Sequence, residues 1–275
     1  MIVSRPNNLT ARETGSDNSD MLDVKSRPQR WRGDYGIDGG ASAVFGLVGM
    51  GAVGLLLTGC GFYHARSAHY FVAFPELLIG LALLQAVPSY LYSTRRGKLV
   101  VWAELLGELS LRGDEQVLDL GCGRGAVLGL VARAVPHGHA VGLDLWRPED
   151  QSGNSPEATW KNLEAEGVRD RCELKTGDMM AAPFADGSFD LVVSSLAIHN
   201  IRGREGRDKA VGEASRVLRA GGRLVIADLM WTKAYARRLR ELRMEDVVTR
   251  HLGWRFWFGV LGTQTGLVTA RKPLA

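Results

Sequence analysis

The clearest place for chemistry in this sequence is an apolar segment that runs into closely spaced glycines. Val117–Leu120 is followed by Gly121, Gly123 and Gly125. Glycines let a backbone turn sharply and approach a ligand, because they have no Cβ. Asp119 puts a carboxylate two residues before the first of them. That charge would repel a pyrophosphate, but it suits a cationic ligand head with an ammonium and a sulfonium.

Two more acidic residues stand where apolar segments end. Asp144 closes the segment that begins at His139, and Asp178 comes shortly after Thr176. An acid at such a strand end is placed to accept both hydrogens of a ribose diol, which is the role expected of Asp144. Asp178 is placed to accept from an exocyclic amine of adenine. The alternatives are a surface-loop carboxylate for the first and a turn residue for the second.

A histidine is the candidate for proton transfer. His199 follows an apolar segment that reaches Ser195, so both residues are expected at the same edge of a sheet as the acids. Histidine titrates near neutrality, which makes His199 the candidate base for an acceptor. The alternative is a packing or capping histidine in a loop.

The elements behind these residues alternate between strands and helices. Short strands are expected at 116–120, 139–143, 172–176, 189–194 and 223–227, with helices at 125–135, 156–166 and 205–218. This alternation is typical of a parallel sheet with helices on both faces. After it, residues 229–252 are expected to form one basic helix, with a pair between Arg237 and Glu241. Residues 254–261 and 267–272 are expected to form an antiparallel hairpin.

These motifs in this order resemble the class I S-adenosylmethionine-dependent methyltransferases. The resemblance rests on LDLGCGRG at 118–125, Asp144, GDM at 177–179, PF at 183–184 with DGSFD at 186–190, and RVLRAGGRL at 216–224. It is strongest to the quinone and sterol methyltransferase branch. It implies an α/β, Rossmann-like sheet of seven strands whose last strand is antiparallel.

The resemblance also implies S-adenosylmethionine as the cofactor and a distribution of its parts. The methionine part would lie near Asp119, Gly121 and Gly123, the ribose on Asp144, and the adenine near Asp178 and Met179. Two further residues are expected at the cofactor site because of their neighbours, namely Leu145 and Ser195. Catalysis is assigned to His199 alone, and no metal site is expected.

Two apolar runs precede this domain. No charged residue occurs from Gly39 to Ala65, and Tyr70–Tyr92 contains one acid, Glu76. About 20 helical residues span the ~30 Å hydrocarbon core of a bilayer, so the two runs predict a transmembrane hairpin. Pro75 and Pro88 are expected to end or kink the second helix. The alternative is a buried hairpin of a soluble protein.

The stripe of Ser42, Gly46, Gly54 and Thr58 offers a surface for a second helix, including that of a second copy in a homodimer. Basic residues flank the hairpin on both outer sides, with Lys25 before it and Arg95 after it, and only Arg66 lies between the two runs. The positive-inside rule then places both outer flanks in the cytoplasm. The expected organisation is a disordered polar tail at 1–38, two transmembrane helices at 39–94 and a methyltransferase domain at 99–275.

The composition of the chain narrows the range of possible functions. The 275 residues include 34 lysines and arginines against 30 acids, a surplus of +4 that does not indicate nucleic acid as a partner. Three scattered cysteines form neither a zinc set nor a disulfide framework. We therefore expect a membrane-anchored methyltransferase with a small hydrophobic or lipid-like acceptor. Two alternatives remain, a non-catalytic cofactor-binding scaffold and an NAD(P)-dependent oxidoreductase, since Gly121, Gly123 and Ala126 also fit a dinucleotide fingerprint.

Overall fold

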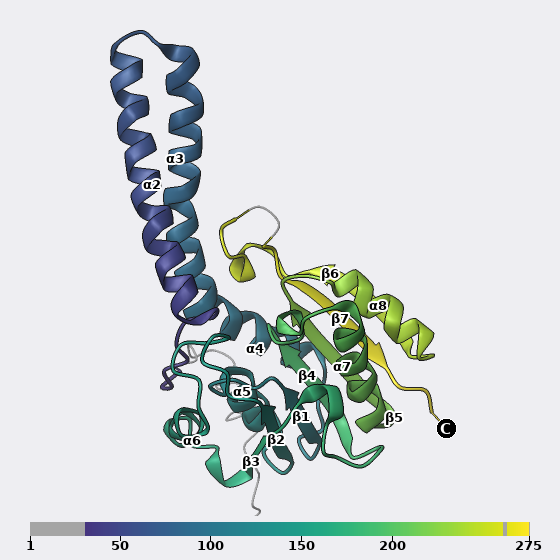
Figure 1. Ribbon diagram of the computed structural model, residues 1–275. Coiled ribbons are helices and arrows are strands. Elements are labelled where there is room, and N and C mark those ends of the chain that lie inside the picture. The colour runs from purple at the N-terminus through teal and green to yellow at the C-terminus, as the bar shows by residue number, and fades with distance from the viewer. Residues whose placement is uncertain (1–30, 261–262, 275) are drawn as a thin grey trace, which may run out of the picture. The chain divides into compact units, whose positions relative to one another are not determined.

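The computed structural model describes residues 31–260 and 263–274 of the chain (Figure 1). Helices α2 (Gly40–Arg66) and α3 (Tyr70–Tyr92) form an antiparallel hairpin, drawn in purple and blue. A π-helical turn at Ser93–Gly97 joins α3 to α4 (Lys98–Glu108), so the second apolar helix continues directly into the domain that follows. The two helices therefore begin and end close to the limits expected from the apolar runs.

Small residues let the two helices of the hairpin approach each other. A Cβ on Gly54 would lie 3.0 Å from Leu84, and a Cβ on Gly80 would lie 2.5 Å from the hydroxyl of Thr58. Gly54 and Thr58 of the expected stripe thus face α3, whereas a Cβ on Gly46 would meet nothing within 4 Å. Two of the four residues of the stripe therefore lie at the contact between α2 and α3.

Both prolines of the second run lie inside α3, so neither of them ends the helix. Its acid, Glu76, lies 2.7 Å from the Nδ1 atom of His64 on α2, which gives the carboxylate a polar partner within the hairpin.

The outer faces of the hairpin expose large apolar side chains. Phe45 is 76% exposed, Phe71 is 99% exposed and Phe74 is 70% exposed. Only 11% of the most apolar window of α2 is buried, and only 17% of that of the continuous helix Tyr70–Glu108. A core helix of a soluble protein would bury such a window, so the length and composition of both helices suit a membrane.

The remainder of the chain forms one seven-stranded sheet in the order β3-β2-β1-β4-β5-β7-β6. The strands are β1 (Gln116–Leu120), β2 (His139–Asp144), β3 (Cys172–Thr176), β4 (Phe189–Ser195), β5 (Leu218–Asp228), β6 (Glu245–His251) and β7 (Gly266–Arg271). The first five pair in parallel, and β7 is antiparallel to both of its neighbours. This confirms the predicted α/β sheet with a C-terminal antiparallel hairpin.

Four helices connect the strands, namely α5 (Ala126–Ala134), α6 (Pro156–Ala165), α7 (Arg204–Val217) and α8 (Thr232–Glu241). Helix α6 begins as expected, with Ser155 accepting from the backbone N–H of Ala158 at 3.1 Å and a proline at the first helical position. Leu118, Leu120 and Leu143 from the sheet are fully buried and form part of the core.

The last part of the chain corrects two predictions. The basic helix expected at 229–252 is only α8, which ends at Glu241, because Arg243 turns the chain at a φ of 59° and the edge strand β6 follows. The first strand of the hairpin is thus β6 rather than 254–261, which begins with a 3₁₀ turn. Nearly every residue of β6 is exposed, so the strand lacks the apolar alternation by which strands are recognised. Glu241 pairs with Arg238 at 3.2 Å rather than with Arg237.

Most of the expected polar tail lies outside the described residues, but its last part packs along the domain. We call residues 32–39 the N-terminal strap. The carboxylate of Glu166 accepts the backbone N–H of Arg32 at 2.7 Å and the hydroxyl of Tyr35 at 2.8 Å. Further along, the N–H of Ile37 donates to Ser152 at 2.8 Å. The strap therefore runs over α6 and the β2–α6 loop before it enters α2.

Candidate functional site

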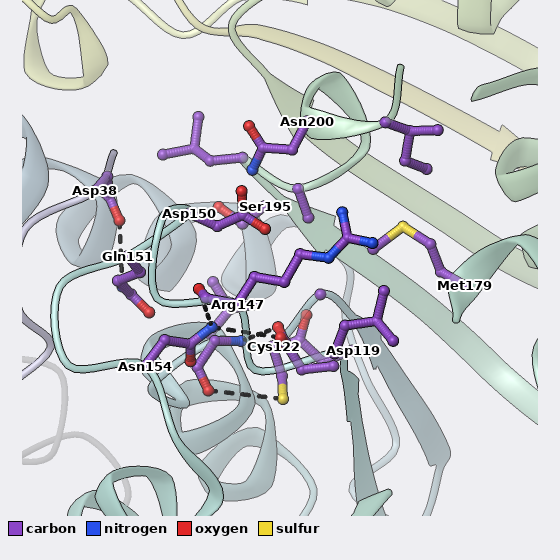
Figure 2. Close-up of a pocket in the computed structure, with 18 of the residues that line it drawn as sticks. Asp38, Asp119, Cys122, Arg147, Asp150, Gln151, Asn154, Met179, Ser195 and Asn200 are labelled. Carbon is purple, nitrogen blue, oxygen red and sulfur yellow. Dashed lines mark hydrogen bonds between the residues drawn. The ribbon is translucent and has the colours of Figure 1, made fainter. Parts of the chain in front are cut away.

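A cavity of about 420 Å³ lies at the carboxyl ends of β1, β2 and β4. Figure 2 shows the residues around it, with Asp119 and Cys122 on one side and Asn200 and Asp150 on the other. The structure brings together on its wall all eight residues that were predicted to bind the cofactor: Asp119, Gly121, Gly123, Asp144, Leu145, Asp178, Met179 and Ser195. The edge of the sheet that the sequence predicts as a binding site therefore borders a cavity.

Asp119 is the most unusual group in this cavity. Its side chain is buried, and neither carboxylate oxygen has a hydrogen-bond partner in the described structure. Burial, together with the nearby charge of Asp144, raises the pKa of Asp119 to about 8. A buried carboxylate without a partner costs free energy, and a cationic ligand group would relieve that cost. The ammonium of S-adenosylmethionine is such a group.

The glycines beside Asp119 have no room for side chains. Gly121 has a φ of 76°, and a Cβ on it would collide with the Cβ of Ala197. Gly123 has a φ of 50°, and a Cβ there would collide with the amide oxygen of Gln151. The first backbone N–H of the turn donates to the carbonyl of Leu143 on β2 at 2.8 Å. Both glycines are therefore required by backbone conformation and by close approach.

Asp144 organises the loop on the other side of the glycine turn. One of its carboxylate oxygens accepts the backbone N–H of Gly123 at 2.8 Å, and the other accepts that of Trp146 at 2.6 Å. The amide of Asn154 donates to the latter oxygen at 3.4 Å. Asp144 thus holds two loops together and still lines the cavity, where its lone pairs can meet a diol.

The remaining predicted residues lie further along the wall. Asp178 accepts the backbone N–H of Met180 at 2.8 Å and caps the short helix at Met179–Ala181, so the turn role weighed from the sequence is present. Leu145 is 41% exposed at the cavity edge. The hydroxyl of Ser195 accepts from the indole N–H of Trp102 on α4 at 2.9 Å.

His199 does not line this cavity, in contrast to the eight residues predicted to bind the cofactor. It lines a second hollow of about 290 Å³, to which Ser42, Tyr90 and Phe258 also contribute. The Nδ1 atom of His199 pairs with the fully buried carboxylate of Asp228 at the end of β5. Burial alone would lower the pKa of His199, but the hydrogen bond and the charge of Asp228 raise it overall.

Several cavity residues were missed from the sequence. Asp38 of the strap and Lys98 of α4 form a buried ion pair at 2.7 Å, and both line the cavity. Gln151 joins them, because its amide donates to Asp38 at 3.2 Å and its oxygen accepts the N–H of Arg124 at 2.8 Å. Asp38 stands in a polar segment without periodicity, so only its contacts identify it. The sequence did give a signal for Lys98, because this lysine lies on an apolar helix. In the structure the residue is only 3% exposed.

Within the residues that the structure describes, no group of three or more histidines, cysteines or acids is placed to hold a metal ion. Cys60, Cys122 and Cys172 are all free thiols.

Comparison with known proteins agrees with this geometry. Residues 118–226 match the family model described as a methyltransferase domain. A ubiquinone/menaquinone biosynthesis C-methyltransferase of Roseobacter denitrificans is 34% identical over 129 residues, which cover 46% of this chain and 48% of that protein. A sterol 4-C-methyltransferase of Caenorhabditis elegans is 30% identical over 128 residues, covering 46% of this chain and 35% of that protein. The chain thus spans half or less of the length of these relatives.

Solved structures share the fold. The [4+2]-cyclase SpnF superimposes with a TM-score of 0.54 at 18% identity, over 66% of this chain and 83% of that one. A geranyl diphosphate methyltransferase, solved in complex with GPP and sinefungin, superimposes with a TM-score of 0.50 at 16% identity, over 65% of this chain and 78% of that one. Fold, matched residues and an orphaned carboxylate at the glycine turn lead to one conclusion. The domain that follows the helical hairpin is similar to the class I S-adenosylmethionine-dependent methyltransferases in its fold and in the residues that match the methyltransferase-domain model.

Proposed function

We propose that this protein transfers a methyl group to a small hydrophobic or lipid-like acceptor at the cytoplasmic face of a membrane that α2 and α3 cross. The observation that carries the methyltransferase assignment is Asp119, whose two buried oxygens lack partners in a cavity beside a glycine turn. The exposed apolar faces of the hairpin support the membrane anchor. The quinone and sterol methyltransferases among the relatives support an apolar acceptor.

Each part of the cofactor has a proposed holder. Asp119 would pair with the ammonium and Asp144 would accept from the ribose hydroxyls. Asp178, Met179 and Leu145 would contact the adenine. When bound, the cofactor supplies an electrophilic methyl group on a sulfonium. The chain's own task is then to align an acceptor and, where the acceptor requires it, to accept a proton, a role that we assign to His199.

The test is methyl transfer from labelled S-adenosylmethionine to extracted membrane lipids by the full-length protein in membranes. We expect a labelled lipid product with the wild type and none with Asp119→Asn. Label that appears only in a soluble metabolite would contradict the lipid-like acceptor. Cofactor binding without any transfer would favour the non-catalytic scaffold.

The protein could also pair with a second copy through α2, where a Cβ on Gly46 would meet no atom within 4 Å. Cross-linking in the membrane tests this pairing separately.

A further inference from the structure

The second hollow, which His199 lines, adjoins the cavity proposed to hold the cofactor. The two spaces share a wall that contains Asp38, Asp150, Leu196 and Asn200. In Figure 2 the labelled members of this wall lie across the cavity from Asp119. A group bound in the second hollow would therefore lie next to the cofactor, on the side away from the residue proposed to hold its ammonium.

The other wall of the second hollow comes from the ends of the apolar helices. Ser42 lies in the first turn of α2, and Tyr90 lies near the end of α3. Phe258 packs edge-on against Tyr90 with ring centroids 4.9 Å apart. The hydroxyl of Tyr90 donates to the carbonyl of Asp38 at 2.7 Å, which joins the helix end to the strap. A molecule with an apolar tail along the hairpin could thus place its head in this hollow.

Among the described residues on this wall, His199 is the only nitrogen base, and its neighbours fix the tautomer of its neutral ring. The carboxylate of Asp228 accepts the backbone N–H of His199 at 3.0 Å, the N–H of Leu229 at 2.9 Å and the hydroxyl of Tyr235 at 3.1 Å, in addition to Nδ1 of His199. Since Asp228 acts as acceptor in all of these contacts, the Nδ1 atom must carry the proton. The neutral ring then presents an unprotonated Nε2, for which no hydrogen bond is found among the described residues.

The charge around the second hollow selects against anions. Asp38 is neutralised by Lys98. Glu149 and Asp150 have no basic partner within 4.0 Å in the described structure, although the charges of Arg147 and of protonated His199 act on Asp150 from further away. Two acidic side chains on the wall would repel a phosphate or carboxylate head, whereas an uncharged head would meet no such cost.

We infer that the second hollow binds the uncharged, hydroxyl-bearing head group of a membrane amphiphile, and that Nε2 of His199 accepts the hydroxyl proton. In that step the O–H bond breaks, its electron pair remains on the oxygen and the proton moves to Nε2. The inference rests on the proposed function, since it supplies the acceptor site that the methyl transfer requires. The proposed acceptor has an uncharged head group and therefore differs from a diphosphate.

Photolabelling of the full-length protein in phosphatidylcholine nanodiscs tests the location and the charge selection. The probes are diazirine-bearing 1-dodecanol and diazirine-bearing dodecyl phosphate, which share a tail and differ in the head. We expect saturable labelling by the alcohol at the second hollow, with at least tenfold less labelling by the phosphate. Ser42→Phe should reduce labelling by the alcohol at least fivefold, while Ala41→Phe, one residue away and not on the wall, should leave it unchanged. Equal labelling by both probes, or no effect of Ser42→Phe, would overturn the site.

Proton transfer has its own readout. A 4-nitrophenol with a dodecyl chain changes its absorbance on losing its proton, so its apparent pKa can be measured when it is bound. We expect a lower apparent pKa with the wild type than with His199→Ala; identical values would remove the role of Nε2. Calorimetry with S-adenosylhomocysteine on the same samples separates the two proposals. Failure to bind it would count against the proposed function, whereas intact binding without labelling of the second hollow would count against this inference alone.

Discussion

Because Asp119 is completely buried, the site without a ligand is unfavourable in free energy. Its carboxylate has no partner, and its pKa of about 8 lies far above the ordinary value of 3.8. In the free protein near neutrality the group therefore keeps its proton, although a cationic ligand would bind to the ionised form. Cofactor binding and proton release should be coupled at this residue.

The affinity for S-adenosylhomocysteine, which retains the ammonium, should consequently depend on pH. Below pH 8 the protonated carboxyl must lose its proton before it can pair with the ligand, so the affinity should fall by up to about tenfold per pH unit. Asp119→Asn should lower the affinity at pH 8 by about 10- to 100-fold and flatten this dependence. Calorimetry between pH 6 and 9 measures both effects. A flat profile for the wild type would show that the ammonium is held elsewhere.

Asp119 should also make the empty protein less stable as the pH rises. Between about pH 4 and pH 8 the folded protein keeps the proton that the unfolded chain has already lost, since the folded-state pKa is the raised one. The free energy of unfolding should therefore fall with rising pH, by up to about 1.4 kcal/mol per unit. Asp119→Asn removes this loss, so it should raise the thermal midpoint at pH 8. A variant less stable than the wild type at pH 8 would contradict the argument.

Asp144 is expected to behave differently because it is already engaged in the fold. Asp144→Ala should weaken binding of S-adenosylhomocysteine, since both a candidate ribose acceptor and the contact to Gly123 are lost. Asp144→Asn retains one oxygen and should weaken binding less. Circular dichroism provides the control for folding. Unchanged affinity in the alanine variant would mean that the ribose is bound by other groups.

His199 should influence turnover rather than cofactor binding. Its pKa is raised by Asp228 despite burial, and Asp150 and Asp38 add to the increase. If the neutral ring accepts a proton, activity should decline as the pH falls through this raised value, above the ordinary 6.5. His199→Ala should reduce turnover about 10²-fold or more at unchanged binding of S-adenosylhomocysteine. Normal turnover in that variant would exclude the base role.

The N-terminal strap and α4 are the elements that complete the cavity. They meet through Asp38 and Lys98, whose side chains are only 16% and 4% exposed. Thr94, in the π-helical turn before α4, also donates to Asp38 at 2.8 Å. Residues on either side of the apolar hairpin in the sequence thus line one wall. The hairpin is consequently connected to the site by its two ends.

Removing one partner of this ion pair should be more harmful than removing both. Lys98→Met leaves a buried charge on Asp38, which costs about 3 kcal/mol or roughly 6–10 °C in thermal midpoint for a domain of this size. The double variant Lys98→Met with Asp38→Asn removes that uncompensated charge and should recover part of the loss. Tryptophan fluorescence during heating of the full chain in detergent measures this. Additive losses would show that the pair does not couple the strap to α4.

At the scale of the whole molecule, the apolar hairpin and the α/β domain share one continuous helix from Tyr70 to Glu108. The hairpin exposes apolar side chains along its length, and the second hollow lies where its ends meet the domain. An acceptor held in the membrane would therefore reach the cofactor over a short path, without a large soluble lid.

Sidedness can be tested with single cysteines. In a background in which Cys60 is replaced by alanine, Ser67→Cys places a thiol in the exposed turn between α2 and α3. A membrane-impermeant maleimide should label it in intact cells. The control, Ser110→Cys, is exposed in the domain and should react only after permeabilisation. Labelling of both positions, or of neither, in intact cells would contradict a transmembrane hairpin with a cytoplasmic domain.

Local patterns were sufficient to predict the hairpin, strands β1 to β4 and the eight residues on the cavity wall. These features depend on short-range signals, namely the length of apolar runs and the acids that follow buried strands. Edge strand β6 was misassigned because it is charged and exposed, so its conformation comes from pairing with β7 rather than from its own pattern.

The amino-acid sequence alone therefore determined the α/β class of the domain, the edge of its sheet at which the cavity lies and the presence of two helices long enough for a membrane. Only the tertiary structure decided that Asp38 and Lys98 complete the cavity and that His199 faces a separate hollow with Asp228 behind it. The reason is physical: these contacts join residues 29 to 60 positions apart, and the packing of the folded chain creates them rather than any local preference.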